Sequence, residues 1–197
     1  MAVDKKEDSK ASFTLLMTKT CAENEKFLHD KSSEVLREVI ELINDSIDYM
    51  CFYAECWTKR KNEALTHPLF FYVNLVLVPF SYAILCDLLV GNLPACFMEL
   101  RFMLESLAKC HTAELPSEEV FFETKILSLE QKLEKEKVSL SKLMKYFGEI
   151  IGIGSEPPYS LILPSSYTDD DLQILHELAK QVSMFRTILK AAWNEVQ

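Results

Sequence analysis

An almost uncharged stretch in the middle of the chain constrains the fold most. Residues 67–116 carry six charged side chains among fifty, whereas the 197-residue chain is acidic overall, with a formal net charge of -9. Within this stretch, residues 69–90 form an apolar run of 22 residues, close to the length with which a helix crosses a bilayer. This run has to be buried inside a helical bundle, against a second subunit or in a membrane.

Polar residues within and after the run favour burial in protein. The run itself is interrupted by Asn74, Pro79, Ser81 and Asp87. The helix predicted next carries Glu99, Arg101 and Glu105, and charges at membrane depth are costly. We therefore predict a buried helical hairpin formed by residues 69–90 and 94–113, with Gly91-Asn92 as the break because glycine commonly follows a helix end. Anchoring of the chain in a membrane by residues 69–90 is the alternative.

Helical periodicity continues through the rest of the chain. Apolar residues recur every three or four positions over 24–66, which predicts one long helix or two helices joined by a short break. Helices are also predicted over 117–138, over 140–151, and from Thr168 or Asp169 to about residue 195, after a long loop at 152–168. No strand alternation is seen. The sequence predicts an all-α fold, an antiparallel bundle of five to seven helices around the buried apolar hairpin.

The domain organisation is predicted to be simple. Residues 1–20 are polar and are expected to be a partly disordered N-terminus, and residues 21–197 are expected to form a single helical-bundle domain. Residues 1–20 contain no long apolar run, so no secretory signal is expected. The six cysteines are accordingly predicted to be free thiols in a reducing cytoplasm.

Several classes of function are disfavoured by the sequence. A net negative chain does not suit general DNA binding, which needs a cationic surface. The glycines fit neither a phosphate-binding loop nor a dinucleotide-binding pattern, so no nucleotide cofactor is expected. No CxxC pair occurs, and no histidine follows a glutamate at the spacing of a di-iron helix, so no metal site is expected.

Arg101 and Glu105 are the polar pair of greatest interest in the hairpin. They lie one turn apart and share a helix face, among apolar neighbours. A guanidinium in such surroundings needs partners. We consider two roles: a structural ion pair that fixes the position of the helix, and an arginine that binds an anion or takes part in catalysis. Asp87 and Glu99 are further candidates to meet Arg101.

The run from Tyr82 to Ala108 (YAILCDLLVGNLPACFMELRFMLESLA) resembles the core of a set of prokaryotic helical proteins of unknown function, some of them grouped with the HEPN-like bundles. The shared features are an apolar helix, a short break and an L-R-x-x-x-E helix, here with Arg101 and Glu105. The resemblance implies a four- or five-helix bundle that is usually dimeric.

Active HEPN ribonucleases carry an arginine and a histidine separated by four to six residues. Arg60 and His67 have six residues between them, although Lys61 replaces the polar residue that commonly follows the arginine. Under this alternative, His67 would act as the general acid and base, and Arg60 would stabilise the charge on phosphorus. RNA is a predicted partner only in this case.

The leading interpretation is a cytoplasmic helical-bundle protein that acts by protein interaction, as a homodimer formed through the hairpin. Whether the chain is an enzyme stays open, with a metal-independent RNA endonuclease as the catalytic alternative. A small-ligand pocket around Arg101 and Tyr82 is a further alternative.

Overall fold

The computed structural model describes residues 2–59, 68–111 and 164–194, and it confirms the predicted all-α fold. The helices are α1 (Ala2–Lys31), α2 (Ser33–Lys59), α4 (Pro68–Tyr72), the π-helical turn η1 (Val73–Leu77), α5 (Val78–Val90), α6 (Leu93–His111), the 3-10 turn η4 (Asp169–Asp171) and α9 (Leu172–Asn194). The helices predicted over 117–138 and 140–151, and most of the loop at 152–168, lie outside the described residues.

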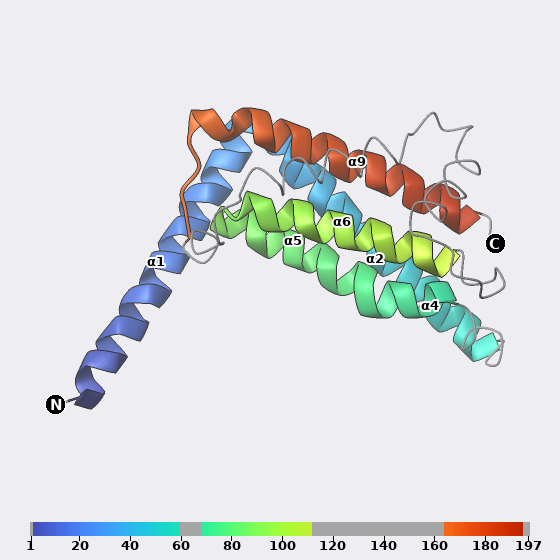
Figure 1. Ribbon diagram of the computed structural model, residues 1–197, viewed down its shortest axis with the longest axis horizontal. Helices are drawn as coiled ribbons and strands as arrows, with labels where there is room; N and C mark the ends of the chain where they lie inside the picture. Colours follow the sequence, from blue (N-terminus) through green and yellow to red (C-terminus); the bar gives the residue numbers. More distant parts are fainter. Residues whose placement is uncertain (1, 60–67, 112–163, 195–197) are drawn as a thin grey trace.

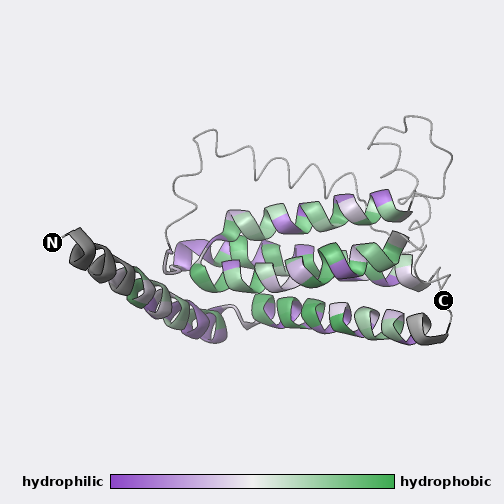
Figure 2. Cartoon of the chain, turned by 90° about the horizontal axis from the view of Figure 1, so that it is seen from below, coloured by the Kyte–Doolittle hydropathy of each residue, from purple (hydrophilic) through white to green (hydrophobic). Residues whose placement is uncertain are grey.

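Four helices of the described chain pack in a closed ring (Figure 1). Helix α2 contacts α9 and α5, and α6 contacts α5 and α9. Helix α5 runs opposite to the other three, and α6 and α9 point the same way (Figure 1). The apolar stripes of the four helices meet in one core, whose largest fully buried side chains are Tyr72, Phe97, Phe185, Leu42, Leu77, Ile84, Leu88, Leu100, Met103 and Leu104. Seen from below, hydrophobic residues recur along all helices of the bundle (Figure 2).

The helix expected over 24–66 is divided by a single residue. Helix α1 ends at Lys31 and α2 begins at Ser33, while the Ser32 carbonyl accepts the Val35 N–H at 3.2 Å. Helix α1 begins at Ala2, so residues 2–20, which were expected to be partly disordered, are helical. Lys, Ala and Leu, which favour helix, make up eight of these nineteen residues.

The apolar run of 69–90 forms one continuous path through α4, η1 and α5. A proline inside a helix clashes with the carbonyl four residues before it and lacks an N–H. Pro79 follows a turn in which Val78 N–H bonds to the Val73 carbonyl, five residues back, instead of four. The wider turn accommodates Pro79 without ending the helix.

The break between α5 and α6 confirms the predicted hairpin. Gly91 has φ +82°, the left-handed conformation that favours glycine, and Asn92 N–H bonds to the Asp87 carbonyl at 2.8 Å. The segment before α9 passes over this turn, where Ser165 N–H bonds to the Val90 carbonyl at 3.0 Å. A side chain at position 91 would place its Cβ 2.0 Å from the Ser165 carbonyl oxygen.

The same segment is fixed to α1 through a buried asparagine. The Asn24 amide donates to the carbonyls of Leu89 and Ser165, both at 2.9 Å, and accepts the Tyr167 N–H at 2.9 Å. Thr168 then caps the last helix, as predicted, in a reciprocal arrangement with Asp171. The end of the bundle formed by the hairpin turn is therefore held together by hydrogen bonds from three distant parts of the chain.

Candidate interaction surface

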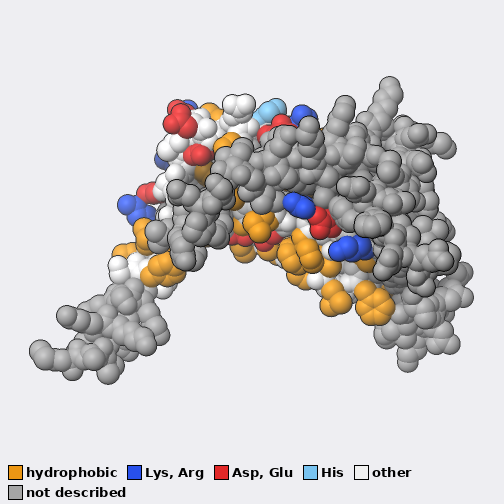
Figure 3. Space-filling model, in the orientation of Figure 1, with side chains coloured by type: hydrophobic (Ala, Val, Ile, Leu, Met, Phe, Trp, Pro, Cys, Tyr) orange, Lys and Arg blue, Asp and Glu red, His pale blue; other side chains and the backbone are white. Residues whose placement is uncertain are grey.

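The outer side of the hairpin is apolar and open to solvent. We call this surface the hairpin face; it consists of Phe71, Leu75, Pro79, Tyr82 and Cys86 on α4, η1 and α5, and Met98 and Phe102 on α6. The spacing of three or four places the residues of each helix on one side. The rings of Phe80 and Phe102 lie 4.8 Å apart and join the two helices. Hydrophobic side chains gather along the lower edge of the molecule, over this hairpin (Figure 3).

Only the inner side of the predicted hairpin is buried within the chain. Of the most apolar window in Leu69–Val90, 28% of the residues are buried. Leu75 is 67% exposed, and Phe71 and Tyr82 are 48% and 46% exposed. The largest apolar patch on a typical monomeric protein is about 300–600 Å² and is often functional. Aromatic side chains cover about 150–250 Å² when fully buried. Five large side chains of the hairpin face are about half exposed or more: Phe71, Leu75, Tyr82, Met98 and Phe102. Together they therefore present on the order of 500 Å² of apolar surface.

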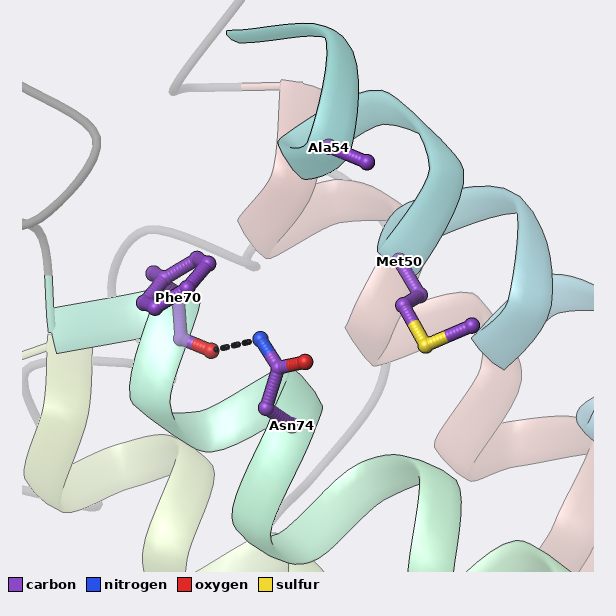
Figure 4. Close-up of a pocket in the computed structure, with 4 residues that line it drawn as sticks. All are labelled: Met50, Ala54, Phe70 and Asn74. Atoms are coloured by element: carbon purple, nitrogen blue, oxygen red, sulfur yellow. Dashed lines mark hydrogen bonds between the residues drawn. The ribbon is translucent and has the colours of Figure 1, made fainter. Parts of the chain in front are cut away.

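An apolar cavity of ≈ 350 Å³ lies beside the hairpin face, between α2 and the start of the hairpin. Met50 and Ala54 line it from α2, and Phe70 and Asn74 line it from α4 and η1 (Figure 4). Asn74 donates its amide N–H to the Phe70 carbonyl at 2.8 Å, so part of the hydrogen-bonding capacity of this polar side chain is used within the cavity wall (Figure 4). The cavity extends the apolar surface toward α2.

Arg101 and Glu105 form the ion pair that their spacing allows. Arg101 Nε donates to Glu105 Oε1 at 2.7 Å. The arginine side chain is 39% exposed and the glutamate side chain 23% exposed. The pair lies next to Phe102 and marks the charged border of the hairpin face on α6. Solvent screens a pair with this exposure, so it contributes little to stability.

Asp87 and Glu99, which were candidates to meet Arg101, meet each other across the hairpin. Glu99 is half-buried and hydrogen-bonded to Asp87, and burial followed by the charge of Asp87 raises the pKa of Glu99 to about 8. Its Oε2 is buried and, among the described residues, has no hydrogen-bond partner. Asp87 also accepts a hydrogen bond from the Asn92 amide at 3.2 Å. At neutral pH a protonated Glu99 therefore connects α6 to the carboxylate of α5.

A second charged cluster, which the sequence analysis did not identify, joins α9 to α2. The Arg186 side chain is 12% exposed and donates to Asp45 at 2.7 Å, to Glu38 at 2.8 Å and to Glu41. The three acids are spaced three and four apart on α2, so one helix face presents them all. That spacing was the available signal, but the partner lies some 140 residues further along the chain.

Arg60 and His67, the proposed ribonuclease residues, lie outside the described residues. Among the described residues no group of three or more His, Cys, Asp and Glu side chains is placed to hold a metal ion. Cys21, Cys51, Cys86, Cys96 and Cys110 are free thiols in the described part of the chain. The described residues contain one helical path long and apolar enough to span a membrane by length and composition, Leu69–Val90.

Comparison of the chain with models of protein families, with curated proteins and with solved structures gives no match.

Proposed function

We propose that this chain is a cytoplasmic interaction protein that forms a homodimer through the hairpin face. The observation that supports the proposal is an exposed apolar stripe that runs along α4, η1 and α5 and joins α6 at Phe102. Transfer of apolar area from water yields about 25 cal/mol per Å². Covering the stripe is therefore strongly favourable, and a second copy supplies an identical apolar surface in a two-fold arrangement.

The charges around the hairpin face support a protein partner over a bilayer. Helix α6 follows α5 after Gly91 and Asn92 alone, so both helices would have to enter the membrane together. Helix α6 carries the Arg101–Glu105 pair, and each charge at membrane depth costs about 2.5–3.5 kcal/mol on insertion scales. The apolar length of Leu69–Val90 nevertheless makes membrane binding the outcome against which the proposal is tested.

The test is the mass of the full chain in solution. Light scattering at micromolar concentration should give twice the chain mass of 22.7 kDa. The variant Leu75→Glu should shift the mass to that of the monomer, because it places a charge in the centre of the hairpin face. Ile174→Glu is the matched control: Ile174 is 44% exposed on α9 and is not part of the hairpin face, so this variant should stay dimeric.

Two results would overturn the proposal. One is a wild-type mass of 22.7 kDa across the micromolar range. The other is co-flotation of the wild-type chain with phospholipid vesicles that is lost in Leu75→Glu, which would assign the hairpin face to a membrane. Circular dichroism of each variant should show unchanged helix content, so that loss of association is not confused with unfolding.

A further inference from the structure

Helix α1 extends past the bundle and presents an apolar strip that nothing in the described chain covers. Its first part projects beyond the end of the bundle near the hairpin turn (Figure 1). Phe13 and Leu16 are 46% and 45% exposed, and Met17 is partly buried. We call these three residues the arm strip. Burial in α1 begins at Thr20, which is 4% exposed.

The arm strip continues the face by which α1 packs on its own bundle. Phe13, Leu16 and Met17 are followed at helical spacing by the buried residues Thr20 and Asn24. The packing face of α1 therefore extends about two turns beyond the surface that the described residues provide. Leu15, which is 71% exposed, lies on the opposite side of the helix.

The arm strip does not reach the hairpin face of its own chain. Helix α1 is continuous from Ala2 to Lys31, and Asn24 fixes it to the hairpin turn through the Leu89 carbonyl. The arm thus points away from the bundle (Figure 1). At 1.5 Å per residue, the arm strip lies roughly 5–10 Å beyond Thr20 along the helix axis, where it is free to contact a neighbouring copy.

We propose that in the dimer the arm strip of each copy packs on the hairpin face of the other. This inference rests on the proposed function. A standard interface buries about 800 Å² on each partner. An arm strip of on the order of 200 Å² covers a similar area of the opposite hairpin face, so the two exchanged contacts bury on the order of 400 Å² on each partner. The rest of each hairpin face, on the order of 300 Å², packs on its counterpart, which brings the total near the size of a stable interface.

The experiment compares dissociation constants of full-length variants by analytical ultracentrifugation. The arm variant, Phe13→Glu with Leu16→Glu, should weaken association at least tenfold. Leu15→Glu is the matched control on the other side of the same helix and should dimerise like the wild type. Glutamate is a good helix former, so neither variant should change the helix content measured by circular dichroism.

Mixing two defective variants tests the exchange itself. The hairpin variant Leu75→Glu keeps an intact arm, and the arm variant keeps an intact hairpin face. An equimolar mixture should form heterodimers more tightly than either variant forms homodimers, because one arm-to-hairpin contact is restored. A mixture that associates no better than its components would overturn the exchange.

The outcomes separate this inference from the proposed function. If Leu75→Glu is monomeric but the arm variant dimerises like the wild type, the hairpin face mediates association without the arm, and the exchange is wrong. If the wild type itself is monomeric, the proposed function fails first.

Discussion

Glu99 makes the stability of the hairpin depend on pH. Its pKa is raised from 4.5 to about 8 in the folded chain, first by burial and then by Asp87. Between these pH values the folded state binds more protons than the unfolded state. The free energy of unfolding therefore falls as the pH rises from about 4.5 to 8 and loses no more through this group above that range.

Glu99→Gln should remove this pH dependence. The variant is expected to match the wild type near pH 5 and to exceed its free energy of unfolding by about 1–2 kcal/mol near pH 9, well below the full shift because Glu99 is only half-buried. Urea unfolding at several pH values measures the difference. Glu25→Gln, on the exposed side of α1, is the control and should leave the pH profile unchanged. Parallel profiles for wild type and Glu99→Gln would contradict the assignment.

Among the charged residues discussed here, Arg186 is the one whose substitution should lower the free energy of unfolding most. Its guanidinium compensates Glu38 and Asp45, whose side chains are 11% and 16% exposed. Arg186→Gln leaves these carboxylates without their main partner, and breaking a buried ion pair in this way costs about 3 kcal/mol. Chemical unfolding at pH 7 measures the loss. Arg37→Gln is the control, since Arg37 is 61% exposed and its removal should change stability by less than about 1 kcal/mol.

Local spacing made some of these residue contacts predictable and left others out of reach. The Arg101–Glu105 pair follows from one turn of helix, so the sequence indicates it directly. Asp87 and Glu99 meet each other across the hairpin and not Arg101, and this contact depends on how α5 and α6 are rotated against each other. The spacing of charges within one helix does not encode that rotation.

At the scale of elements, the helix ends were predictable because their signals are local. Gly91 and Thr168 end and begin helices for conformational and hydrogen-bonding reasons that need no distant partner. The π-helical turn before Pro79 was not predicted. A proline in a helical sequence can either end the helix or be accommodated by a wider turn, and only the packing around it decides which occurs. The contact of Ser165 with the hairpin turn depends on a chain return across more than seventy residues.

Gly91→Ala should therefore lower the free energy of unfolding by far more than the loss of a helix-ending glycine alone would. The substitution strains the backbone at φ +82° and drives a Cβ to within 2.0 Å of the Ser165 carbonyl oxygen. We expect a loss of about 3 kcal/mol or more, since the left-handed strain of about 1–2 kcal/mol adds to displacement of the segment before α9. Thermal unfolding measures it. Ser166→Ala, an exposed change in the same segment, should have little effect, and equal effects of the two would contradict the close approach.

At the scale of the whole molecule, hydrophobic content alone did not reveal which side of the hairpin is covered. The sequence predicted that residues 69–90 are buried, and the ring of α2, α5, α6 and α9 buries their inner side. A helix that is apolar all round has a second side, and the described residues contain no further layer that covers it. The described part of the chain thus leaves apolar surface exposed both on the hairpin face and on the projecting start of α1.

Coupling of folding to association should make the thermal stability depend on protein concentration. If the dimer is the stable form, the midpoint of unfolding rises with concentration, because mass action favours the associated native state. For a chain of this length the shift is about 2 °C for each tenfold increase in concentration. Calorimetry over two decades of concentration should show this rise in the wild type and in Ile174→Glu. The midpoint of Leu75→Glu should be independent of concentration, because a monomer unfolds without dissociating. A wild-type midpoint that does not move would show that the native protein does not associate through the hairpin face.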